Sequence, residues 1–131
     1  MSACSTARAR SETNLTVEDA SARVLASGAG VLYFSVRNDG PGAERLKRVD
    51  VPLAADAQLH EIVEQQGVSR MDPAPNGFQI PGHSTLSLAH GGKHVMLFGV
   101  HLPHGASQLE AVAFFERSGA IPFKARLSDG Q

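Results

Sequence analysis

The sequence predicts an all-β domain, built as a Greek-key β-sandwich or a small barrel. Thirteen glycines and seven prolines interrupt the chain of 131 residues, and sustained helical periods are scarce. Between these interruptions lie roughly seven to nine short runs rich in Val and other apolar residues, with aromatic residues among them, as strands separated by turns would be. Many short strands at this spacing are typical of closed antiparallel architectures.

The first 52 residues contain three of these runs. Residues 15–25 are ambiguous, because Thr16 and Asp19 imitate a helix capping box while the apolar residues form no helical stripe. We expect one or two strands there. The run 30–38, "GVLYFSVRN", is the clearest strand and ends in a turn-rich segment. Residues 44–52 alternate polar and apolar side chains, as a half-buried strand does.

The middle of the chain predicts a β-hairpin, with one strand at 57–64 and the other at 68–73. We expect its loop to be the four residues 64–67, because Gly67 can adopt a positive φ. Pro103 and Gly105 make the segment 101–107 a loop. The remaining expected strands are 84–89, 93–100, 109–118 and 121–127.

Length and charge indicate one domain with no preference for nucleic acid. The formal net charge is −1, and no long basic patch occurs, so we expect no nucleic-acid partner. No apolar run reaches the roughly 20 residues that span a bilayer. We expect a flexible leader at 1–13, a folded domain at 14–127 and a short tail at 128–131.

The leader contains the only cysteine of the chain, Cys4. The tripeptide Ser2-Ala3-Cys4 matches the end of a bacterial lipoprotein cleavage box, in which the cysteine becomes lipidated. We therefore expect a periplasmic or extracytoplasmic protein anchored through Cys4; the alternative is a chance cysteine in the leader. A single cysteine excludes an intramolecular disulfide and a cysteine-rich zinc site.

Two short stretches carry candidate metal ligands. His94 and Met96 are two residues apart in an expected strand, so their side chains point to the same face. With a four-residue hairpin loop, antiparallel pairing would place His60 directly opposite Met71, with Cβ atoms about 5 Å apart. Two imidazoles and two thioethers could then converge on one ion.

This donor set points to copper. Thioether sulfur is soft and favours copper(I), while imidazole accepts copper in either oxidation state. A blue-copper electron-transfer site needs a cysteine thiolate, and no cysteine lies in the expected domain. Thioethers also survive mild oxidation, so methionine suits copper(I) transport outside the cytosol. Taken singly, each of the four residues could be structural.

The spacing of the four residues resembles that of PCu(A)C-type periplasmic copper(I) chaperones. Ten residues separate His60 from Met71, and twenty-two separate Met71 from His94-Val95-Met96. The second gap is one residue longer than is usual in the family, and the loop 72–84 accommodates the extra residue most easily. The similarity covers most of residues 14–127, including the stretches 33–46, 80–100 and 111–127.

The resemblance implies a cupredoxin-like or immunoglobulin-like β-sandwich that binds one copper(I) ion and performs no catalysis. It implies delivery to the binuclear copper centre of cytochrome c oxidase subunit II, in cooperation with a Sco-type thiol protein. We expect a monomer. Carried over by position, the candidate ligands are His60, Met71, His94 and Met96.

Two other functions remain open at this point. One is an extracytoplasmic β-sandwich that binds a protein partner, with incidental His and Met residues. The other is a copper or zinc enzyme, which the sequence disfavours because no nucleophile and base are recognisable. His83 and His90 are expected to be exposed in turns, and His101 and His104 could form a weak secondary copper(II) site in their loop.

Overall fold

The computed structural model describes residues 14–128, and these residues fold into ten β-strands. Among them there is no helix whose length and hydropathy would let it cross a membrane. The all-β fold class predicted from the sequence is confirmed. The strands are β1 (Leu15–Val24), β2 (Gly30–Asn38), β3 (Glu44–Asp50), β4 (Asp56–Gln65), β5 (Val68–Pro73), β6 (Phe78–Ile80), β7 (Ser84–Ser87), β8 (His94–Phe98), β9 (Gln108–Phe115) and β10 (Gly119–Leu127).

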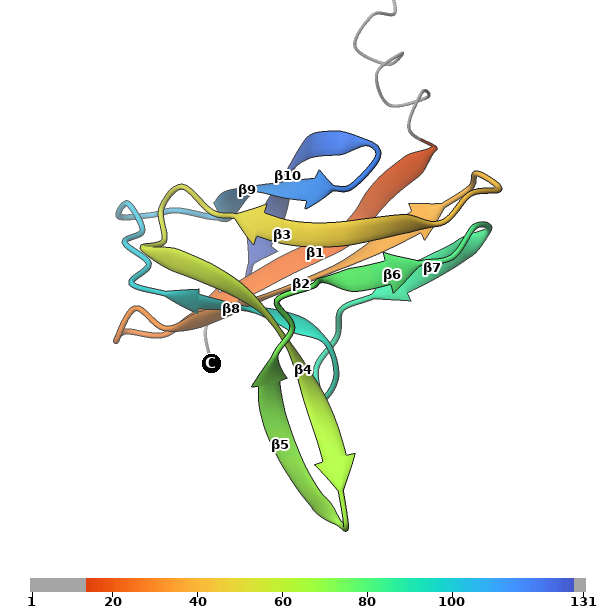
Figure 1. The fold of residues 1–131 in the computed structure, drawn as a ribbon. Helices are drawn as coiled ribbons and strands as arrows, with labels where there is room; N and C mark the ends of the chain where they lie inside the picture. The colour runs from red at the N-terminus through yellow and green to blue at the C-terminus, as the bar shows by residue number, and fades with distance from the viewer. Residues whose placement is uncertain (1–13, 129–131) are drawn as a thin grey trace, which may run out of the picture.

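The strands follow one hydrogen-bonded path, which folds over on itself to form two layers. The order along the path is β5-β4-β8-β2-β1-β10-β9-β3-β6, and β7 pairs with β2. In Figure 1, β3, β9 and β10 lie over β1, β2 and β8, while the β4–β5 hairpin projects away from both layers. The first and last strands pair in parallel, and all other ladders are antiparallel.

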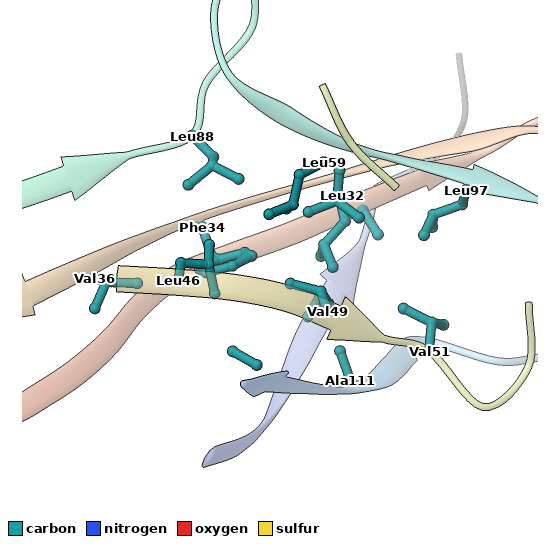
Figure 2. Close-up of a cluster of buried hydrophobic side chains, with 14 of the residues drawn as sticks. Leu32, Phe34, Val36, Leu46, Val49, Val51, Leu59, Leu88, Leu97 and Ala111 are labelled. Carbon is teal, nitrogen blue, oxygen red and sulfur yellow. The ribbon is translucent and has the colours of Figure 1, made fainter. Parts of the chain in front are cut away.

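The hydrophobic core lies between the layers (Figure 2). Alternate residues of a strand face opposite sides, so β2 buries Leu32, Phe34 and Val36 and turns the residues between them outward. From the opposite layer, β3 contributes Leu46 and Val49. Apolar side chains that are removed from water in this way supply the main favourable free energy of folding.

The ambiguous segment 15–25 forms a single strand with an irregularity. The register of β1 against β2 shifts between Glu18 and Ser21, and Asp19 has a φ of 55°. A β-bulge of this kind bends the strand, which explains why its apolar residues alternate poorly. The segment 72–84, expected to be a loop, contains the three-residue strand β6, which pairs with β3.

The predicted four-residue loop of the β4–β5 hairpin is wrong. Gln65 already pairs with Val68, so the loop consists of Gln66 and Gly67 alone. Their φ values are 53° and 82°, and two successive residues with positive φ are the pattern of a tight type I′ hairpin.

The shorter loop changes the pairing of the two candidate ligands on this hairpin. Met71 lies opposite Ile62, and His60 lies opposite Pro73. The expected direct pair of His60 and Met71 is therefore also wrong. Because Ile62 is two residues from His60, both candidate ligands still point to the same face of the hairpin.

A buried carboxylate ties β3 to the turn that joins β9 and β10. Glu44 is only 7% exposed and accepts hydrogen bonds from the backbone N–H groups of Arg45, Arg117 and Ser118 and from the Ser118 hydroxyl, at 2.8–3.0 Å. Burial raises the pKa of Glu44, but these hydrogen bonds outweigh it and leave the pKa below 4.5. The ionised form therefore stabilises the fold.

Replacement of Glu44 by Gln should lower the free energy of unfolding by about 1–3 kcal/mol at pH 7, because one carboxylate oxygen becomes an amide donor facing other donors. Chemical denaturation measures the loss. Since the folded pKa lies below the unfolded one, the difference from the wild type should shrink as pH falls below 4.5. Glu116→Gln, at an exposed carboxylate, is the control and should have little effect. Equal stability of the Glu44→Gln and Glu116→Gln variants would contradict this account.

Candidate metal site

The centre of the candidate site is a pair of histidines on neighbouring strands. His60 of β4 lies directly opposite His94 of β8, and Gln58 lies opposite Met96 in the same antiparallel ladder. Residues two apart share a face, so both histidines and Met96 point away from the core while Leu59 faces into it. The structure thus brings three of the four predicted residues together.

The two imidazoles face each other at short range. Their ring centroids are 5.7 Å apart, and the rings are inclined by 55°. His94 is 7% exposed, which is unusual for a residue on the outer face of a sheet. The His60 Nε2 lies 3.0 Å from the Gln58 Oε1, whereas the His60 Nδ1 is buried and has no hydrogen-bond partner. A buried nitrogen without a partner is costly unless something binds it.

A tight turn before β8 fixes the ring of His94. The His94 Nδ1 lies 2.9 Å from the carbonyl oxygen of Gly92. Because a carbonyl only accepts, this hydrogen bond places the proton on Nδ1 and leaves the Nε2 lone pair available. The turn itself is closed by hydrogen bonds from the Ala89 N–H to the Lys93 carbonyl and from the Gly92 N–H to the Ala89 carbonyl.

The two methionines flank the histidine pair on opposite sides. Met96 is half-buried on β8 and lies diagonal to His60, while Met71 is 45% exposed on β5 and lies diagonal to His60 in the other direction. Diagonal neighbours on one face have Cα atoms roughly 7–8 Å apart, which long side chains can bridge. All four predicted residues therefore share one face of the β5-β4-β8 segment, with Met71 on the projecting hairpin.

The surroundings of His60 favour its uncharged ring. Burial lowers the pKa of His60 from its ordinary value of 6.5, and the nearby His94 lowers it further. Within residues 14–128, no three side chains drawn from His, Cys, Asp and Glu come together as a metal-binding group. Any ion held here would thus depend on two imidazoles and on sulfur, without a carboxylate or a thiolate.

One neighbour of the site was not predicted from the sequence. His90 is exposed, as expected, but its Nδ1 lies 3.5 Å from the Tyr33 hydroxyl. Both residues line a shallow groove of ≈ 370 Å³ together with Met96. No sequence signal joins positions 33 and 90, because they meet only through the pairing of β2 with β8. His101 and His104 are exposed in the loop after β8, and the secondary copper(II) site there stays a prediction.

The chain matches the family model described as "Putative lipoprotein LpqE-like" over residues 15–127, which is nearly the whole described domain. The chain belongs to the LpqE-like family. This family is the PCuAC family, so the resemblance inferred from the sequence is confirmed at the level of the family.

One relative is similar to this LpqE-like domain in sequence, and two solved structures are similar to it in fold. The putative lipoprotein Lxx21020 of Leifsonia xyli subsp. xyli is 36% identical over 115 residues, which cover 82% of this chain and 69% of the relative. The apo PCuAC domain from PmoF1 superposes with a TM-score of 0.70 at 25% identity, covering 88% of this chain and 93% of that one. The CuI-DR1885 structure from Deinococcus radiodurans superposes with a TM-score of 0.66 at 22% identity, covering 94% and 85%.

The lowered pKa of His60 predicts its behaviour in the metal-free LpqE-like domain. Its imidazole should take up a proton only below pH 6.5, because burial and His94 both disfavour the charged ring. The measurement is an NMR pH titration of the His60 ring signals. Replacement of His94 by Asn should move the midpoint upward, since one of the two causes is removed. A wild-type midpoint at or above 6.5 would contradict the burial of this ring.

Proposed function

We propose that this LpqE-like protein is an extracytoplasmic copper(I) carrier that binds one ion through His60, His94, Met96 and Met71. The observation that carries the proposal is the buried His60 Nδ1, which has no partner and belongs to a ring facing His94. Met96 adds a thioether on the same face. Two imidazoles with soft sulfur suit copper(I) better than zinc or magnesium.

The position and chemistry of the donors support transfer rather than storage or catalysis. Neutral ligands bind the ion without the Coulombic attraction that thiolates would add, so the ion can be passed to a stronger acceptor. Met71 is 45% exposed on a projecting hairpin, where an incoming protein can reach it. A protein of the same fold, DR1885, has been solved with CuI, which supports copper(I) as the ion.

The proposed recipient is the binuclear copper centre of cytochrome c oxidase subunit II, with a Sco-type thiol protein as a second partner and the carrier acting as a monomer. The family description and the name of the Leifsonia relative both include the word lipoprotein, which supports an extracytoplasmic, lipid-anchored location. The residue proposed as the anchor, Cys4, lies outside the described residues.

Anaerobic titration with copper(I) against a chromophoric chelator tests the ligand set. The wild type should form a 1:1 complex, and Met96→Leu should weaken it by about tenfold, which corresponds to the loss of roughly 1.4 kcal/mol. Met71→Leu should weaken binding as well, because the leucine side chain has a similar size but no sulfur. Val95→Ala in the same strand is the control, since Val95 faces the core.

Two outcomes would reject the carrier. One is the absence of a tight 1:1 complex, and the other is a complex that the double replacement Met71→Leu and Met96→Leu leaves unchanged. Either result would favour the alternative function, an extracytoplasmic module that binds a protein partner. That alternative has one observation in its favour, because exposed apolar side chains share the face of the histidine pair: Ile62, Met71 and Phe98.

The same apolar residues generate a prediction about delivery. If the recipient docks on this face, Ile62→Ala should slow copper transfer to the soluble domain of oxidase subunit II while leaving the copper affinity unchanged, because neither isoleucine nor alanine offers a ligand atom. The readout is the copper content of the separated recipient over time. Val68→Ala is the matched control, since Val68 is exposed on the opposite face of the same hairpin. Equal transfer rates for the two variants would contradict docking on this face.

A further inference from the structure

Three polar residues of β4 form a continuous chain of hydrogen bonds that ends at His60. Asp56, Gln58 and His60 are each two residues apart, so their side chains lie in a row on the outer face. The Gln58 Nε2 donates to the Asp56 Oδ2 at 2.8 Å, and the His60 Nε2 lies 3.0 Å from the Gln58 Oε1. The other carboxylate oxygen of Asp56 accepts from the backbone N–H of Ala57 at 2.9 Å, which fixes the start of the row.

The donors and acceptors of this row can be arranged in only one way. An ionised carboxylate accepts hydrogen bonds and donates none, so Gln58 must turn its NH₂ group toward Asp56. The amide oxygen of Gln58 then faces His60, and an amide oxygen also only accepts. The proton of the neutral His60 ring must therefore sit on Nε2, which leaves Nδ1 as a bare lone pair.

We propose that Asp56 and Gln58 are positioning residues that hold His60 in the tautomer whose Nδ1 binds the copper ion. The inference rests on the proposed function, because it assigns a ligand atom within that site. The His60 Nδ1 is the buried atom without a partner, and its ring faces His94. His94 has the opposite arrangement, because its Nδ1 donates to Gly92 and its Nε2 is available. The ion thus binds Nδ1 of one histidine and Nε2 of the other.

The alternative, ligation through Nε2 of both rings, conflicts with the observed contacts. It would break the hydrogen bond between His60 and Gln58, and it would leave the amide oxygen of Gln58 without its donor. The proton would also move to the buried Nδ1, where no acceptor lies within reach. Hydrogen bonds to the second ring nitrogen commonly orient metal-binding histidines, and their loss weakens metal affinity by about 10-fold to 100-fold.

Long-range ¹H–¹⁵N NMR of the metal-free protein tests the tautomer directly. The wild type should show the proton of His60 on Nε2 and that of His94 on Nδ1. Gln58→Leu, which removes the acceptor, and Asp56→Ala, which frees the amide to rotate, should both give a mixture of tautomers at His60 alone. Gln58→Glu keeps an acceptor for Nε2 and should restore the single tautomer. Glu61→Gln, on the opposite face of β4, is the control and should change nothing.

Silver(I), which has the same d¹⁰ configuration as copper(I) and no accessible redox change, identifies the ligand nitrogens. Its addition should shift the His60 Nδ1 and the His94 Nε2 signals, and Gln58→Leu should weaken copper(I) affinity about 10-fold to 100-fold with an unchanged unfolding temperature. A His60 tautomer that neither Gln58→Leu nor Asp56→Ala disturbs, or silver bound at the His60 Nε2, would overturn the inference. A wild type that binds neither ion would defeat the proposed function instead, while the metal-free spectra would still decide the role of Asp56 and Gln58.

Discussion

The antiparallel ladder between β4 and β8 determines the geometry of the candidate site. Its register sets His60 opposite His94 and Gln58 opposite Met96. A shift by one residue would turn every outward side chain of β4 into the core, and Leu59 would become exposed. The hydrophobic core therefore specifies the register, and the register specifies which polar groups meet on the outer face. Core packing therefore also determines which side chains form the candidate site.

One face of the β4–β8 ladder is apolar and packs into the core, whereas the other face carries the candidate metal ligands. Val95 and Leu97 are fully buried and pack against the second layer, whereas His94 and Met96 alternate with them on the outer face. His94 is nevertheless buried on that face, and the turn at 89–93 supplies the acceptor for its Nδ1. A site assembled on the wall of a sandwich in this way needs no cavity inside the fold.

The sequence predicted the local features of the site and missed the non-local ones. The pair His94 and Met96 follows from alternation within one strand, and the structure places both on one face. The pairing within the hairpin was predicted wrongly, because the Gln66-Gly67 loop lacks the Asn-Gly or Asp-Gly sequence that marks a two-residue turn. The contact between His60 and His94 joins strands distant in sequence. Convergence of the two imidazoles on one ion was expected from their chemistry, but no local pattern predicted that β4 pairs with β8 in this register.

The projecting β4–β5 hairpin has a mechanical consequence. Every residue of β5 is exposed or half-buried, so this strand contributes little to the core, whereas β8 buries His94, Val95 and Leu97. Met71 thus lies on a strand that contributes little to the core, His94 and Met96 lie on a strand anchored in the core, and His60 lies on the strand between them. In the proposed carrier, an ion bound by Met71 and by the other three residues would hold β5 close to β8. Replacement of Met71 by a sulfur or nitrogen atom of the acceptor would free β5, while His60, His94 and Met96 still held the ion.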